Sequence, residues 1–334
     1  MRRGSKILAG LILVILAYIA AGGALVAAEG FHPMRGRMVD IGGRRLHIVC
    51  EGERNTEPTV LFEAGAFGFS ADWGVVQDRV AALGLHTCSY DRAGLGLSDP
   101  GPGPRDGLAA TKDLEALLKA AGEDGPLILV GHSMAGTYMP LFAARNHDRV
   151  RGLVFVDAAP PEAIDQPAVH GFVEKFAAAS RWAALGARVG LYHPLSMTWF
   201  GDKIGLTPVA SAEKRRAFAS PTHNRWASAE VDQCLNTAAE AKAAGPLDPA
   251  WPVAVVTAGP VQGREAWKAL QTAPARRSAH GYVDHVEAAS HPTLLGISHA
   301  DAVVRGVAFV RQAVADEAAP PAQKMAQSAA AARP

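Results

Sequence analysis

The sequence is poor in cysteine and carries almost no net charge. Its three cysteines, Cys50, Cys88 and Cys234, are too few for a disulfide-built scaffold, and no two of them form a CxxC pair. The formal net charge is +1 with no basic block, so composition gives no support to nucleic-acid binding. HExxH, GxxxxGK[ST] and GxGxxG motifs are also missing, which removes the usual carriers of zinc, P-loop and dinucleotide sites. The sequence implies no metal and no organic cofactor.

The first 30 residues predict a membrane segment. Arg2, Arg3 and Lys6 precede an uncharged apolar run over 7–28, and roughly 20 such residues suffice to span a bilayer as a helix. A cleaved signal peptide is the alternative, since Val-Ala-Ala at 26–28 suits a signal peptidase, although apolar signal regions are usually only about 7–15 residues long. We favour a retained anchor with the remaining chain outside the cytoplasm, in the periplasm for example. Cleavage would make the protein secreted.

Strand-like and helix-like segments alternate in two parts of the chain, 37–159 and 251–315. Such alternation predicts a mainly parallel sheet covered by helices on both faces. Residues 160–250 contain many alanines and no convincing strand, so we expect a helical insertion there. The tail over 317–334 is rich in Ala, Pro and Gln, a composition typical of disorder.

The stretch LILVGHSMAGTYMP, residues 127–140, places Ser133 where a buried strand turns into a helix. A helix N-cap is a common role for serine. That role does not explain Gly131 before the serine or the small residues Ala135 and Gly136 after it. Strand, Gly-x-Ser-x-small and helix together form the pattern of a nucleophile elbow, in which the turn exposes the serine oxygen at the sheet edge.

On these residues the chain resembles the α/β-hydrolase family, with Ala135 in place of the usual last glycine of GxSxG. VLFEAGAFGFSADW (60–73) looks like the family's oxyanion strand and loop, and YDRAGLGLSD (90–99) is similar to its turn after the next strand. The resemblance covers about residues 37–315. It implies a mainly parallel eight-stranded sheet with helices on both faces, and a helical cap formed by the insertion.

The resemblance also implies roles for individual residues. Ser133 would be the nucleophile, and His291 in AASHPTLL falls where the family places its catalytic base. The oxyanion donors would be the backbone N–H groups of Ala66 and Met134.

Two carboxylates compete for the third position of the triad. Most family members carry the acid after the strand that precedes the last one, where Glu265 is the only nearby carboxylate. Others carry it after the strand that follows the elbow helix, where GLVFVDAA places Asp157. We favour Asp157, because Ser133, Asp157 and His291 also follow the family's chain order of serine, acid and histidine.

The expected activity is hydrolysis of a small-molecule carboxylic ester through an acyl-enzyme. A serine at the elbow argues against the dehalogenases and epoxide hydrolases of this family, which use a carboxylate nucleophile. An amide or peptide substrate, as in the family's aminopeptidases, is the second reading. A non-catalytic binding module of the same fold is the third.

Two further expectations concern side chains outside the triad. In the family's fold the strands holding Cys50 and Cys88 lie side by side, so an exported chain could form a Cys50–Cys88 disulfide while Cys234 stays free. The tryptophans of the insertion either line an apolar acyl pocket or belong to a helical core; they are Trp182, Trp199 and Trp226.

Overall fold

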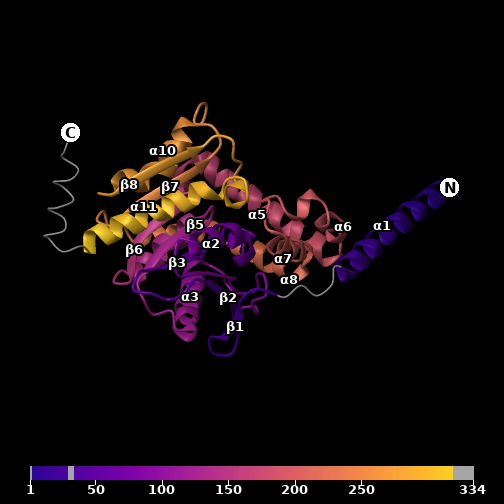
Figure 1. The fold of residues 1–334 in the computed structure, drawn as a ribbon. Coiled ribbons are helices and arrows are strands. Elements are labelled where there is room, and N and C mark those ends of the chain that lie inside the picture. Colours follow the sequence, from indigo (N-terminus) through magenta and orange to yellow (C-terminus); the bar gives the residue numbers. More distant parts are fainter. Residues whose placement is uncertain (1, 29–33, 319–334) are drawn as a thin grey trace.

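The computed structural model describes residues 2–28 and 34–318. Its centre is an eight-stranded sheet of order β1-β2-β4-β3-β5-β6-β7-β8 (Figure 1). The strands are β1 (Arg37–Asp40), β2 (Arg45–Glu51), β3 (Thr59–Glu63), β4 (Thr87–Tyr90), β5 (Leu127–His132), β6 (Val150–Val156), β7 (Val253–Ala258) and β8 (Gly281–Val286). The pairs β1–β2 and β2–β4 are antiparallel and every other pair is parallel, which confirms the mainly parallel sheet.

Helices cover both faces of this sheet, as predicted. They are α2 (Gly74–Ala81), α3 (Gly107–Ala121), α4 (Ala135–Arg145), α10 (Glu265–Arg277) and α11 (Ala300–Ala318). Side chains alternate along each strand, so Ile128 and Val130 of β5 pack in the core beneath α2 and α11. Leu127 and Leu129 of the same strand pack in the second core, beneath α3, α4 and α10.

Local sequence signals set the ends of helix α3. The side chain of Asp106 accepts a hydrogen bond from the Ala109 N–H, so Asp106 caps the helix, which begins at Gly107. Gly122 closes it with φ of 73°, a left-handed conformation that glycine adopts without steric cost.

Between β6 and β7 the chain forms helices only. These are η2 (Pro161–Asp165), α5 (Pro167–Arg188), α6 (His193–Ser196), η3 (Trp199–Gly201), α7 (Pro208–Ala219), α8 (Pro221–Val231) and α9 (Cys234–Ala243). The prediction that all three tryptophans lie in a pocket or core is wrong for Trp182 and Trp199, which are 72% and 66% exposed. Trp226 is partly buried against the turn at Gly94.

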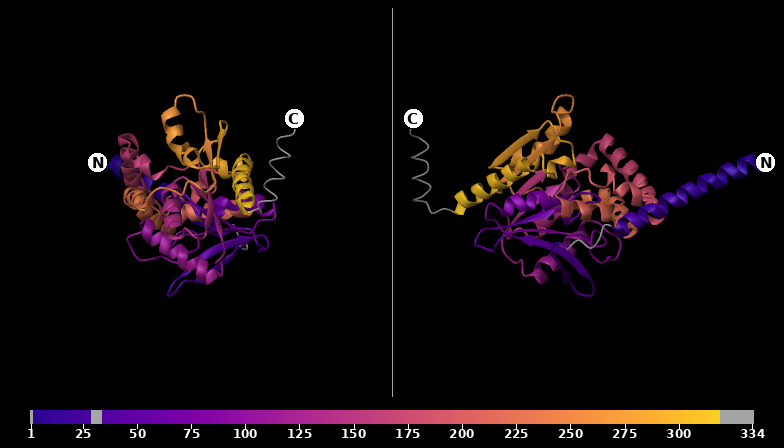
Figure 2. Two further views of the ribbon diagram at one scale, coloured as in Figure 1. Left: turned by 90° about the vertical axis from the view of Figure 1, so that its left-hand side faces the viewer. Right: turned by 45° about the vertical axis from the view of Figure 1, so that its right-hand side comes forward.

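Helix α1 (Arg2–Ala28) leaves the molecule beside α6 and points away from the sheet (Figures 1 and 2). Its Gly4–Ala24 part is long and apolar enough to cross a membrane, a test that a signal sequence also passes. Helix α11 extends to Ala318. The prediction of disorder is therefore wrong for residues 317 and 318, and the rest of the predicted tail, 319–334, lies outside the described residues.

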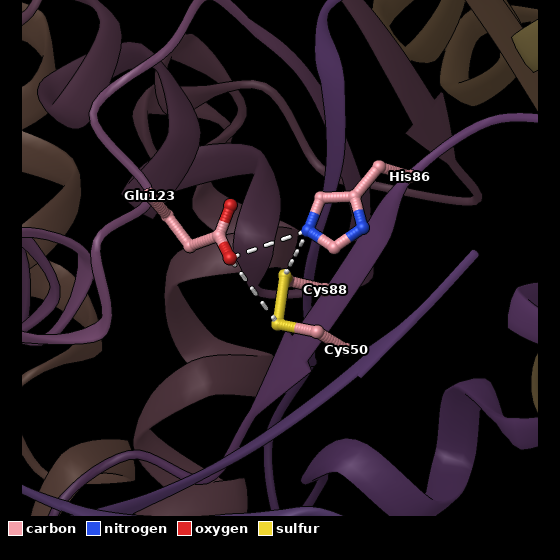
Figure 3. Close-up of side chains that lie close together, drawn as sticks. All are labelled: Cys50, His86, Cys88 and Glu123. Carbon is pink, nitrogen blue, oxygen red and sulfur yellow. Dashed lines mark hydrogen bonds and ion pairs between the residues drawn. A yellow bond between two sulfur atoms is a disulfide. The ribbon is translucent and has the colours of Figure 1, made fainter. Parts of the chain in front are cut away.

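Cys50 and Cys88 form a disulfide between paired positions of the antiparallel strands β2 and β4. His86 and Glu123 surround it, with His86 Nε2 3.2 Å from a Glu123 carboxylate oxygen and 3.7 Å from the Cys88 sulfur (Figure 3). These four residues hold metal-ligand atoms within 4.8 Å of one another. Because both sulfurs are bonded to each other, neither offers the thiolate that binds a metal, so the cluster is the environment of a disulfide.

Replacing both cysteines by alanine is expected to lower the melting temperature. The disulfide closes a loop with a sequence separation of 38, and loops of that size correspond to about 2–4 kcal/mol of stability. In a chain of this size such a loss lowers Tm by about 3–7 °C, measurable by calorimetry. Cys234→Ala is the matched control, since this cysteine is free, and a double variant as stable as the wild type would contradict the prediction.

Candidate active site

Ser133 lies in the sharp turn between β5 and α4. Its φ is 58°, a left-handed conformation that is costly for a residue with a side chain. The turn leaves little space: a Cβ at Gly131 would lie 2.8 Å from the Cβ of Ala135, and one at Gly136 would lie 2.2 Å from the carbonyl oxygen of Ala159. The small residues around Ser133 are therefore required by packing. Ser133 is partly exposed and stands at the carboxyl edge of the sheet.

The loop after β3 meets this turn. A Cβ at Gly65 would lie 2.8 Å from the Cβ of Ser133, so only glycine allows the loop to approach so closely. Within the described part of the chain, neither the Ala66 N–H nor the Met134 N–H donates a hydrogen bond to the protein. The two groups predicted as oxyanion donors are thus free to bind another acceptor.

His291 and Asp157 form a close pair at the same edge of the sheet. Asp157 follows β6 and His291 lies in the loop after β8, and the Nδ1–H of the imidazole donates to Asp157 Oδ2 over 2.6 Å. The other carboxylate oxygen, Oδ1, accepts from Gln271 Nε2 at 2.9 Å and from the Ala258 N–H at 3.2 Å. The carboxylate is therefore fixed in orientation from both sides.

The surroundings of Asp157 keep it ionised. Its burial alone would raise the pKa, but the hydrogen bond and the charge of His291, with the bonds from Gln271 and Ala258, lower the pKa to about 2. The carboxylate is then negative at all ordinary pH values. It orients the imidazole and stabilises a positive charge on it.

Glu265, the alternative acid, is placed elsewhere. It is exposed in the first turn of α10, and its side chain accepts a hydrogen bond from the Gly263 N–H at 2.8 Å. A local contact of this kind lowers the pKa of Glu265. The structure brings Asp157, and not Glu265, against His291.

His132, next to the serine, has a positioning role that the sequence did not reveal. Its Nε2–H donates to the backbone oxygen of His291 over 3.0 Å, and the two rings lie 4.4 Å apart. Burial, followed by the neighbouring His291, lowers the pKa of His132 to about 3, so this ring stays neutral.

Arg92, in the turn after β4, makes its hydrogen bonds well outside that turn. The buried guanidinium donates to the carbonyl oxygens of Ala64 at 2.7 Å and Gly65 at 2.9 Å, in the loop that carries Ala66. It also pairs with Glu230 of α8 at 2.8 Å. Arg92 thus connects the oxyanion loop to the helical insertion.

Other insertion residues contact the same loop. The oxygen of Phe67 accepts from Lys214 Nζ at 3.0 Å and from His223 Nε2 at 3.3 Å, and the ring of Phe67 lies 6.2 Å from that of Phe176 in α5. The thiol of Cys234 in α9 contacts the sulfur of Met134 at 3.0 Å. The insertion therefore covers the edge of the sheet at which Ser133 stands.

Backbone strain is concentrated at this edge. In the described residues, the non-glycine residues with positive φ are Phe67 (57°), Ser133 (58°) and Asp157 (41°). Each such conformation costs on the order of 1–3 kcal/mol and persists only where the surroundings enforce it. All three belong to the oxyanion loop or to the predicted triad.

Ser133 and His291 do not hydrogen-bond to each other within the described residues. The imidazole of His291 is about half exposed, at 47% of its side chain, so it has room to turn toward the serine. In structures without substrate such contacts are often long and tighten only when substrate binds. A cavity of about 270 Å³ lies where the insertion joins the core, lined by Pro160 and Pro246 among others, and Ser133 and His291 are not part of its lining.

The buried, neutral side chains of His132 and His223 are expected to make the folded protein less stable in acid. Burial, followed by positive neighbours, lowers the pKa of His132 and of His223 to about 3, against about 6.5 in an unfolded chain. Between about pH 6.5 and 3 the unfolded chain binds more protons, so the free energy of unfolding falls as the pH falls, by up to about 1.4 kcal/mol per pH unit for each histidine. Above about pH 6.5 the contribution of these two histidines to the free energy of unfolding does not change with pH.

Melting curves from pH 7.5 to 4.5 test this expectation. His223→Gln should flatten the fall in Tm, whereas the same change at the exposed His280 should leave its slope as in the wild type. A Tm that stays level down to pH 4.5 would show that these rings are not neutral in the folded state.

A parallel sheet that brings a serine turn, an imidazole and a carboxylate to one carboxyl edge defines the class of α/β hydrolases. A family model described as the alpha/beta hydrolase family matches residues 60–306. The chain therefore belongs to the alpha/beta hydrolase family.

Comparison with individual proteins supports the fold. The Cif epoxide hydrolase from Acinetobacter nosocomialis superposes with a TM-score of 0.66 at 17% identity, over 88% of this chain and 96% of that one. The enol-lactonase from Burkholderia xenovorans LB400 gives a TM-score of 0.56 at 21% identity, over 82% and 99%. A probable transporter of Hormonema carpetanum is 38% identical over 138 residues, which are 39% of this chain and 19% of the transporter. The chain thus spans about a fifth of the length of the first curated relatives it matches.

Proposed function

We propose that the protein is a serine hydrolase that cleaves carboxylic esters through an acyl-enzyme. The observation that carries the proposal is the His291–Asp157 pair, 2.6 Å between Nδ1 and Oδ2, at the sheet edge where Ser133 occupies a strained turn. These are the base, the orienting acid and the nucleophile that acyl transfer requires.

The proposed reaction has two halves. Ser133 Oγ attacks the ester carbonyl carbon while His291 Nε2 takes its proton, and the Ala66 and Met134 N–H groups bind the developing oxyanion, each contributing about 3–4 kcal/mol. The bond to the alcohol breaks as His291 returns the proton to the leaving oxygen. Water, activated by the same imidazole, then attacks the acyl-enzyme and releases the acid and Ser133.

We further propose that α1 anchors the protein in a membrane. The positive charges of Arg2, Arg3 and Lys6 precede the apolar Gly4–Ala24 stretch or lie at its start, which favours an N-terminus in the cytoplasm and a hydrolase domain on the other side. The disulfide Cys50–Cys88 is consistent with an oxidising compartment.

The test uses the full chain in mild detergent with p-nitrophenyl esters from acetyl to dodecanoyl, and with the corresponding anilides. Turnover of the esters with a pre-steady-state burst of nitrophenol supports the proposal, because a burst reports an accumulating acyl-enzyme. Faster turnover of the anilides would favour the amide-cleaving reading. Folded protein that turns over neither class would leave the binding module as the better description.

A further inference from the structure

The exposed aromatic side chains of the molecule are concentrated in the helical insertion. Outside α1, the large aromatic residues with strongly exposed side chains in the described part of the chain all lie between η2 and α7: Phe172, Trp182, Trp199 and Phe200. Leu185, Val189 and Leu191, which lie between Trp182 and Trp199 in the sequence, are exposed as well. We name Trp182, Leu185, Val189, Leu191, Trp199 and Phe200 the apolar rim. Soluble surfaces rarely gather so many large apolar side chains unless the surface binds something.

The apolar rim adjoins the place where α1 contacts the insertion. Gly22 of α1 is buried against Pro194 of α6, since an added Cβ would lie 2.3 Å from the proline ring. A Cβ at Gly190 would lie 3.1 Å from Ile19. The contact points in the insertion, residues 190 and 194, lie inside the 182–200 segment that carries the rim.

The position of this contact along α1 sets the depth of the rim. The 21 residues of Gly4–Ala24 measure about 32 Å at 1.5 Å per residue, close to the roughly 30 Å of a bilayer's hydrocarbon layer. Ile19 lies five residues, about 7.5 Å, from the domain-side end of that stretch. Interfacial apolar surfaces insert to about 5–10 Å, at the boundary between headgroups and acyl chains.

The chemistry of the rim fits this boundary. Tryptophan is enriched at membrane interfaces because its ring is apolar and its N–H is polar. The Lys203 ammonium lies 5.1 Å from the ring centres of Trp199 and Phe200, and Arg188 is exposed next to Val189. These cations are placed to meet anionic lipid headgroups.

We infer that the apolar rim is seated in the lipid–water interface of the bilayer that α1 spans, and that the site receives acyl esters dissolved in that bilayer. The inference rests on the proposed anchoring and ester hydrolysis. The same insertion that carries the rim contacts the oxyanion loop, through Phe176 of α5 and through Lys214 and His223. The part of the chain that would meet a lipid-dissolved ester is thus the part that contacts the loop next to Ser133.

Lipid contact is measured on the full chain reconstituted in vesicles of phosphatidylcholine and phosphatidylglycerol, with brominated phosphatidylcholine as quencher of tryptophan fluorescence. Bromine in the upper acyl chain should quench part of the emission, and that part should vanish in the variant W182F/W199F. The matched variant W226F/W251F removes two other tryptophans and should keep it. Equal quenching of both variants, or none in the wild type, would overturn the inference.

Substrate delivery is measured with two esters. The double variant Trp199→Ser/Phe200→Ser should raise KM for a long-chain ester presented in vesicles about five-fold or more. Its kcat/KM for water-soluble p-nitrophenyl acetate should stay as in the wild type, because the site itself is unchanged. Leu83→Ser, an exposed apolar position in the α/β core, is the control and should change neither value. Equal losses on both esters would show that the rim supports the fold rather than lipid contact.

The outcomes separate this inference from the proposals beneath it. Wild-type protein that cleaves no ester would refute the proposed chemistry, while the quenching experiment would still decide lipid contact. Release of the full chain from vesicles by alkaline carbonate would refute the anchor, and the inference would fall with it.

Discussion

Replacing Ser133 by alanine is expected to lower kcat for short p-nitrophenyl esters by about 10⁴–10⁶-fold. Without the hydroxyl no acyl-enzyme can form, and the burst of nitrophenol should vanish together with turnover. The residual rate would come from the Ala66 and Met134 amides and from binding, which act without the nucleophile. Stopped-flow absorbance of the full chain in detergent measures both kcat and the amplitude of the nitrophenol burst.

Ser290→Ala is the matched control for this variant. Ser290 carries an exposed hydroxyl directly before His291. This variant therefore tests whether a serine near the imidazole other than Ser133 acts as the nucleophile. We expect it to retain its burst. Full activity in the folded Ser133→Ala protein would mean that Ser133 is not the nucleophile, whatever its backbone conformation.

The sequence predicted the sheet and the serine turn because both depend on local patterns. Apolar runs with small residues at their ends mark buried parallel strands, and Gly131 and Ala135 mark a turn with no room for larger side chains. The helical nature of the insertion also followed from composition. These features required no knowledge of which elements meet in space.

The roles of His132, Arg92 and Gln271 could not be read from the sequence, because each depends on a contact across the fold. Arg92 reaches Glu230, 138 residues away, and Gln271 reaches Asp157, 114 residues away. A charged residue in a turn and a glutamine in a helix have no local pattern that marks such partners. The exposure of Trp182 and Trp199 was missed for a related reason: an apolar side chain predicts burial, and no local pattern shows which of them stay on the surface of the folded chain.

The second large effect is expected from Asp157→Asn, which should lower kcat/KM for short esters about 10⁴-fold near neutral pH. Gln271 and the Ala258 N–H both donate to Oδ1, so they would hold the oxygen of the new amide at that position. Its NH₂ group would then face His291 Nδ1, which could only accept. The imidazole would carry its proton on Nε2, the nitrogen that must receive the proton of Ser133.

Glu265→Gln separates this effect from a general loss of carboxylates. Glu265 contacts the Gly263 N–H and not His291, so this variant should keep its activity within about two-fold, as expected for an exposed position away from the chemistry. Steady-state kinetics of both variants on the acetyl ester decides which of the two carboxylates acts with His291. If Glu265→Gln lost activity while Asp157→Asn kept it, the acid would act after a rearrangement of the α10 region. Asp157 would then be only a strained support for the loop of His291.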